Sequence, residues 1–196
     1  MRLHVPIRLR WSDLDAYAHV NNAEMLRLLE EARIEAFWSN DEPGTVSPGS
    51  EPSGSEPSGS DPAGSEPAVS ASADALRASV PPLPGTGQST AVLDGRPGAA
   101  TLTLIARLEI EYLAPIPYLR APIDIQLWIG KLGGASLDVC YEVRGPVGQD
   151  PQRLYARATT TIVLVDAATE RPRKINAVER AAWTPYLEAP VDFTRK

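Results

Sequence analysis

The chain has 196 residues, of which 43% are hydrophobic, and its formal net charge is −6 at pH 7. This length and hydrophobic content are enough for one folded domain with a substantial core. The acidic balance argues against a nucleic-acid surface as the main function, so we expect small molecules or proteins as partners.

The cysteine and histidine content restricts the chemistry further. A single cysteine, Cys140, excludes an internal disulfide framework and a cysteine-rich zinc site, and its position in an alternating run suits a buried strand residue. Only His4 and His19 are available as histidine ligands, so we predict no metal. The N-terminus lacks the apolar core of a signal peptide and no segment is long enough to span a bilayer, so we expect a cytoplasmic protein.

The first predicted elements are a strand, a polar turn and a long helix. The strand is indicated by alternating apolar residues, which are Val5, Ile7, Leu9 and Trp11. The helix is predicted from about Asn22 to Trp38 by apolar residues at helical spacing, which are Met25, Leu28, Leu29, Ala32 and Ala36. The turn between them carries Asp13, Asp15 and His19, and the first N–H groups of a helix form a positively polarised cap. A carboxylate beside such a cap is typical of a catalytic or binding site.

The next segment, residues 41–98, changes abruptly to Pro, Gly, Ser, Glu and Ala with a near-repeat of the form Gly-Ser-Glu-Pro. Such a sequence cannot bury enough apolar area to offset its ordering entropy, so we predict a disordered, low-complexity insert. The folded domain is therefore predicted over residues 1–40 and 99–196.

Four more strands are predicted after the insert, by alternating runs centred on residues 102–110, 123–129, 137–143 and 154–164. Turn residues separate them, so the last three should be antiparallel neighbours. A short helix is expected at residues 177–182. The predicted class is α+β, with a curved antiparallel five-stranded sheet wrapped around a long central helix.

Several motifs resemble those of the hotdog-fold acyl-CoA thioesterases of the 4-hydroxybenzoyl-CoA thioesterase type. The pattern Asp-x-Asp-x-x-Gly-His-Val-Asn-Asn is matched by residues 13–22, and Glu31-Ala32-Arg33 continues it in the helix. Residues 109–115 (Glu-Ile-Glu-Tyr-Leu-Ala-Pro) and 130–136 (Gly-Lys-Leu-Gly-Gly-Ala-Ser) are further matches. Two positions depart from the pattern, because Ala18 replaces a glycine and Met25 stands where a tyrosine is frequent.

The resemblance implies a catalytic role for Asp15, either as a nucleophile that forms an acyl-enzyme anhydride or as a general base for water. It implies that the backbone N–H of Asn22 holds the oxyanion, with Asn21 as a helper or a simple helix cap. His19 would bind substrate or orient the loop, or be satisfied by neighbouring backbone. Asp13 is assigned to the architecture of the turn.

The resemblance also indicates how coenzyme A is held and how subunits assemble. The coenzyme A part of the substrate would contact a hairpin made of Lys131, Gly133, Gly134, Ala135 and Ser136, although a plain hairpin turn explains the glycines equally well. Glu31 would reach across a dimer or, as the simpler interpretation, pair with Arg27 on the same helix. A homodimer with a continuous sheet, or a homotetramer of such dimers, is expected.

Two functions follow from these features. The first is an acyl-CoA thioesterase that hydrolyses a thioester to free acid and CoA without a separate cofactor. The alternative is a non-catalytic acyl-thioester-binding scaffold protein of the same fold, in which the acidic insert recruits a partner. A dehydratase of this fold is a third possibility, but its histidine and acid are placed differently.

Overall fold

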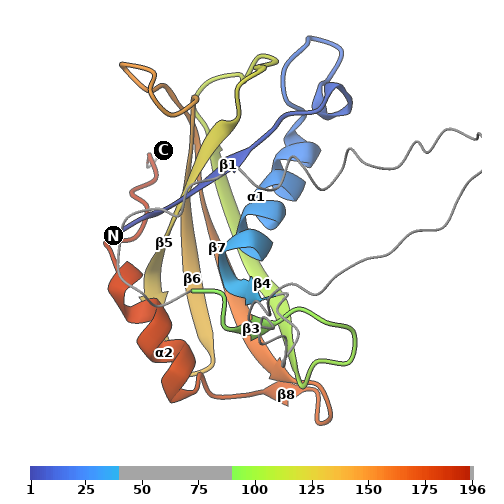
Figure 1. Cartoon of the computed structure of the whole chain (residues 1–196), viewed down its shortest axis with the longest axis vertical. Coiled ribbons are helices and arrows are strands. Elements are labelled where there is room, and N and C mark those ends of the chain that lie inside the picture. The colour runs from blue at the N-terminus through green and yellow to red at the C-terminus, as the bar shows by residue number, and fades with distance from the viewer. Residues whose placement is uncertain (40–89, 195–196) are drawn as a thin grey trace, which may run out of the picture. The chain divides into compact units, whose positions relative to one another are not determined.

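An antiparallel sheet forms the body of the protein in a computed structural model, which describes residues 1–39 and 90–194 (Figure 1). The strands lie in the order β1–β5–β6–β7–β4, and β8 pairs with β7. Their bounds are Leu3–Ile7 (β1), Thr101–Tyr112 (β4), Ile123–Leu132 (β5), Ser136–Arg144 (β6), Leu154–Asp166 (β7) and Arg171–Pro172 (β8). The five alternating runs are thus confirmed as strands, whereas β8 was not predicted.

The predicted long helix is α1 (Asn22–Phe37), which lies across one face of the sheet (Figure 1). The side chain of Asn21 accepts a hydrogen bond of 2.8 Å from the N–H of Ala23, so it caps the N-terminus. The helix ends where Trp38 takes an extended conformation. All five apolar residues predicted for its inner face are buried, and they join the core formed with β5, β6 and β7.

The end of the predicted insert belongs to the folded body, which corrects the boundary at residue 98. Residues Leu93–Asp94 form β3, which pairs in parallel with β2 (Trp38–Ser39) directly after α1. Thr90 is buried, and its hydroxyl donates a 2.6 Å hydrogen bond to the carbonyl of Ala36. These contacts hold Thr90, Leu93 and Asp94 against the end of the helix and the residues after it. The remainder of the predicted insert lies outside the described residues.

The first strand is shorter than its apolar alternation suggests. It ends at Ile7, and Trp11 instead begins a 3₁₀ turn, η1 (Trp11–Asp13), with 75% of its surface exposed. The reason is local: a carboxylate oxygen of Asp13 accepts the N–H of Arg10 at 2.6 Å and closes the turn. The prediction that the alternating run forms a strand as far as Trp11 is therefore wrong.

Strand β5 is buried on both faces, which the sequence analysis did not predict. Its inward residues Ile125 and Leu127 lie in the core, while Asp124 and Trp128 are buried on the opposite face. The covering segment follows α2 (Ala177–Trp183) and η2 (Thr184–Tyr186) and runs back along β5. The indole N–H of Trp128 donates to the carbonyl of Ala189 in this segment at 2.8 Å.

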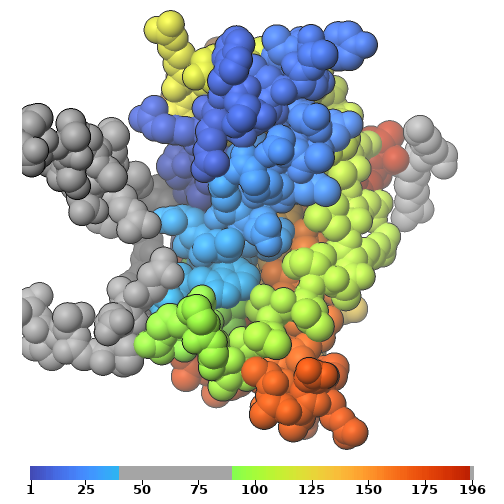
Figure 2. Space-filling model, turned by 90° about the vertical axis from the view of Figure 1, so that its right-hand side faces the viewer, coloured from blue at the N-terminus to red at the C-terminus, as the bar shows by residue number. Residues whose placement is uncertain are grey.

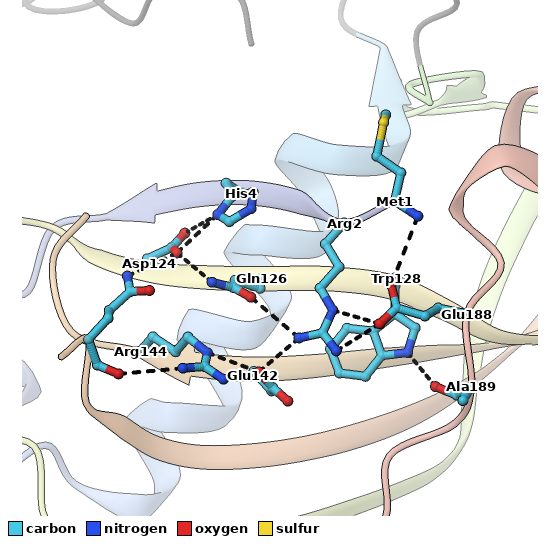
Figure 3. A network of polar contacts seen from close by, with 11 residues as sticks. Met1, Arg2, His4, Asp124, Gln126, Trp128, Glu142, Arg144, Glu188 and Ala189 are labelled. Atoms are coloured by element: carbon cyan, nitrogen blue, oxygen red, sulfur yellow. Dashed lines mark hydrogen bonds and ion pairs between the residues drawn. The ribbon is translucent and has the colours of Figure 1, made fainter. Parts of the chain in front are cut away.

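Charged side chains tie this covering segment and the N-terminus to the outer face of the sheet (Figure 3). Arg2 lies between two carboxylates and contacts both Glu142 and Glu188 at 2.8 Å. Further along β1, His4 contacts the buried carboxylate of Asp124 at 3.0 Å. Both ends of the described chain are therefore held on one face, opposite α1.

The other face presents α1 and the edge strand β4 side by side (Figure 2). The register of β4 against β7 shifts between Ile105 and Arg107. The apolar run predicted to share one inward face is therefore only partly buried, and its first half is exposed, with Leu104 at 55%. No helix within residues 1–39 and 90–194 combines the length and apolar character needed to cross a bilayer.

Candidate active site

The turn between β1 and α1 is organised by the side chain of Asp15. Its Oδ1 atom accepts hydrogen bonds from the backbone N–H groups of Tyr17 at 2.9 Å and His19 at 3.1 Å. The backbone N–H of Asp15 donates to the carbonyl of His19 at 2.8 Å. Ala18 completes the turn with a φ of 59°, in the left-handed region that favours glycine. Ala18 therefore has a backbone conformation that glycine adopts more readily.

Asp13 anchors this turn to the helix. Its carboxylate is buried, and one oxygen lies 2.6 Å from a guanidinium nitrogen of Arg27. Arg27 also pairs with Glu24 and Glu31 on α1. This placement agrees with the architectural interpretation of Asp13, and Glu31 pairs with Arg27 of the same helix.

A pocket of about 330 Å³ opens beside the turn and brings the three predicted catalytic residues together. Asp15, His19 and Asn22 line one side of it, and the other walls are largely apolar. The lining residues from the rest of the chain are Val20, Met25, Tyr112, Leu113, Ala114, Pro115, Ile116, Tyr155 and Ala156. A polar edge on an apolar cavity is the usual form of a small-molecule site.

Asn22 is the residue of this pocket at the N-terminal end of a helix. It is the first residue of α1, and within residues 1–39 and 90–194 its N–H makes no hydrogen bond. The N-terminal end of a helix carries a partial positive charge, which favours an oxygen that gains negative charge. A carboxylate and a free N–H on the same pocket can attack or hydrate an electrophilic carbonyl and stabilise the resulting oxyanion.

Two tyrosines of this pocket were missed as site residues. The hydroxyl of Tyr112 donates to the carbonyl of Asn22 at 3.2 Å, so it fixes the first turn of α1 from β4. Burial raises the pKa of Tyr112, which keeps the phenol protonated as a donor. The sequence could have indicated Tyr112 as a site residue, because it lies in the matched motif of residues 109–115. Tyr155 lies in none of the matched motifs.

The predicted coenzyme A hairpin lies at the far end of the sheet from this pocket. Ala156 of β7 lines the pocket, while Ser136 pairs with Val163, seven residues further along the same strand. At about 3.3 Å per residue, this is a separation of roughly 23 Å. The structure therefore does not bring Lys131, Gly133, Gly134, Ala135 and Ser136 to Asp15 within one chain.

Contacts within the chain already occupy much of the hairpin backbone. The N–H of Gly133 donates to the carbonyl of Ser136 at 2.8 Å, and a guanidinium nitrogen of Arg180 donates to the Gly133 carbonyl at 2.7 Å. The carbonyls of Gly134 and Ala135 accept the N–H groups of other segments. Contacts within the chain therefore already use these backbone groups.

Cys140 lies in the sheet and outside the pocket that contains Asp15. It is buried, and burial raises the pKa of its thiol, which disfavours a reactive thiolate. Among the residues that the structure describes, no three His, Cys, Asp or Glu side chains are grouped so as to hold a metal ion.

Comparison with known proteins gives a family and a set of solved structures. A family model described as the thioesterase-like superfamily matches residues 9–185. The PA5185 protein from Pseudomonas aeruginosa is 17% identical over 96% of this chain and 94% of its own, with a TM-score of 0.59. A predicted thioesterase from Bacillus stearothermophilus is 17% identical over 97% and 100% of the two chains, also with a TM-score of 0.59.

The dynemicin thioesterase is a third similar structure, 13% identical over 96% of this chain and 97% of its own, with a TM-score of 0.56. At these identities the likeness shows the fold alone. No curated protein matches the sequence.

Proposed function

Because the chain belongs to the thioesterase-like superfamily and has its hotdog-type fold, we propose that it is an acyl-CoA thioesterase of the 4-hydroxybenzoyl-CoA thioesterase type. The observation that carries this proposal is that Asp15 and Asn22, the first residue of α1, line the same pocket. The apolar walls suit an acyl group, and the polar edge suits the thioester carbonyl. Coenzyme A is part of the substrate, so the reaction needs no cofactor.

In the proposed reaction, Asp15 acts on the thioester carbonyl and Asn22 holds its oxygen. Asp15 either attacks the carbonyl carbon to give an anhydride that water then hydrolyses, or it removes a proton from the attacking water. In both routes the thiolate of CoA leaves and the acid is released. An oxyanion donor contributes about 2.7 to 4 kcal/mol and a helix dipole alone about 0.3 to 2 kcal/mol, so the directed N–H should dominate.

Replacement of Asp15 by Asn tests the proposal. Release of free thiol is measured over short, long and aromatic acyl-CoAs, and turnover of an accepted substrate should fall by about two to four decades. Glu35→Gln is a matched control, because Glu35 is an exposed carboxylate on α1 outside the pocket. The side-chain truncation Asn22→Ala should have a smaller effect because the backbone supplies the proposed donor.

Two outcomes would reject this function. Unchanged turnover in a folded Asp15→Asn variant would remove Asp15 from the chemistry. Acyl-CoA binding in calorimetry without thiol release, across the whole panel, would instead support the non-catalytic scaffold.

A homodimer through β4 is proposed as the functional unit. β4 is an edge strand, and its side chains Leu102 and Leu104 are exposed, which is unfavourable in an isolated subunit. Pairing of two β4 strands would continue the sheet and cover these residues. The hairpin of residues 131–136 lies roughly 23 Å from the Asp15 pocket of the same chain. If this hairpin holds coenzyme A, the substrate must therefore occupy the pocket of another subunit in this dimer or in a tetramer.

A further inference from the structure

A second pocket, of about 240 Å³, lies between the C-terminal half of α1 and the beginning of β4. Both elements are seen on the face shown in Figure 2, where α1 is light blue and β4 yellow-green. Glu30, Arg33, Ile34 and Trp38 line it from α1 and its end, and Ile105 lines it from β4. None of these residues lines the pocket of Asp15, and Arg33 lies about 16 Å further along the helix axis than Asn22.

Arg33 is unusual in this pocket because its charge is buried without a counterion. Only 5% of its surface is exposed. Within the described parts of the chain, its one hydrogen bond runs from Nη1 to the hydroxyl of Tyr141 at 3.3 Å, and it forms no ion pair. A buried cation usually lies beside an anion, because desolvation otherwise destabilises it by several kcal/mol.

Among the described residues, no carboxylate lies within ion-pair distance of Arg33. Burial raises the pKa of Tyr141 to about 12, so its phenol is neutral at physiological pH. Glu30 lines the same pocket and is exposed, but it forms no ion pair with Arg33. Arg33 therefore retains several N–H donors on the wall of a cavity whose other residues include Ile34, Trp38 and Ile105.

We propose that this pocket binds a small organic acid, with its carboxylate on Arg33 and its apolar body against Ile34, Trp38 and Ile105. A guanidinium matches a carboxylate through two parallel hydrogen bonds. The volume of about 240 Å³ is below the range typical of drug-sized ligands, so the acid is small. Apolar walls favour a carboxylic acid over an inorganic anion. The proposal does not depend on hydrolysis of a thioester.

Isothermal titration calorimetry of the full chain with benzoate tests the site, with benzamide as a neutral analogue and inorganic phosphate as an anion without an apolar body. Benzoate should bind at least about tenfold more tightly than benzamide or phosphate, because benzamide lacks the charge and phosphate lacks the apolar contact. Arg33→Gln should weaken the binding of benzoate by a similar factor. Arg33→Lys should weaken this binding less, because the positive charge remains.

Ile34→Asp provides a variant that does not disturb the buried contact with Tyr141. Ile34 is exposed at the pocket, and a carboxylate there should repel benzoate and weaken its binding about tenfold. Leu26→Asp is the matched control, since Leu26 is an exposed apolar residue of the same helix outside the pocket.

Three results would overturn the proposal. The first is no benzoate binding in the millimolar range, and the second is phosphate binding as tight as that of benzoate. The third is a change in benzoate affinity in Asp15→Asn but none in Ile34→Asp, which would place the acid in the other pocket. Because no thioester is present in these titrations, their failure is distinct from failure of the proposed function.

Discussion

Ala18→Gly should stabilise the protein, because Ala18 has a backbone conformation that suits glycine. Its φ of 59° lies in the left-handed region, where a side chain costs about 1 to 2 kcal/mol. Glycine removes that strain but also gives the unfolded chain more freedom, which destabilises the folded state by about 0.4 to 1 kcal/mol. The free energy of unfolding should therefore rise by roughly 0.5 to 1 kcal/mol.

Urea unfolding followed by circular dichroism measures this change, and thermal unfolding should show a midpoint higher by about 1 to 4 °C. Ala16→Gly is the control, since Ala16 is an exposed residue of the same turn without a positive φ. That substitution should only destabilise, by about 0.4 to 1 kcal/mol. Equal destabilisation by the two changes would show that Ala18 is not strained, and the account of the turn would be wrong.

Three further predictions concern stability and assembly. Asp13→Ala should destabilise the fold by about 1.5 to 3 kcal/mol in urea unfolding, because it removes a buried partner of Arg27; an effect below about 0.5 kcal/mol would contradict this role. Burial raises the pKa values of Glu142 and Glu179, but ion pairs with arginines outweigh it and lower both. The stabilisation from these two carboxylates is therefore present above pH 4.5, their ordinary pKa, and should decrease as the pH falls below that value. A urea midpoint that stays constant from about pH 6 to about pH 3 would contradict this pH dependence. Leu104→Lys should shift the mass in analytical ultracentrifugation from dimer to monomer, and an unshifted dimer would exclude pairing through β4.

The sequence predicts the elements of this fold well because each depends on a local periodicity. An inward residue at every second position is enough to identify β5 and β7, and the helical spacing from Met25 to Ala36 is enough to identify α1. Burial on the outer face of β5 depends instead on a segment near Ala189, about 60 residues later in the chain. No periodicity within β5 carries that information.

In the candidate site, too, a local motif predicts some features and contacts between distant segments determine the others. Asp15, His19 and Asn22 lie within one turn, so a local motif predicts that they are close together. Tyr112 reaches the pocket from another strand, and its contact with Asn22 depends on how β4 lies beside α1. The predicted hairpin at residues 131–136 has the residue types of a ligand loop, but only the register of the sheet reveals its distance from the pocket.

The two interpretations of Asp15, as a turn cap and as a reactive carboxylate, are compatible because they use different oxygens. Oδ1 accepts the N–H groups of Tyr17 and His19, while Oδ2 makes no hydrogen bond within the described residues. The capping bonds fix the orientation of the side chain and leave the other oxygen without a partner, so the turn already orients the group that we propose as reactive.

This separation predicts how two substitutions of Asp15 should differ. Asn retains a carbonyl oxygen for both capping bonds but lacks the carboxylate, so Asp15→Asn should lose turnover with little loss of stability. Ala has neither the carboxylate nor an oxygen that can accept the capping bonds. Asp15→Ala should therefore also lower the free energy of unfolding by about 0.5 to 2 kcal/mol, as for loss of a helix cap. Equal stability of the two variants would mean that the capping bonds contribute nothing, and the turn could not then be what orients Asp15.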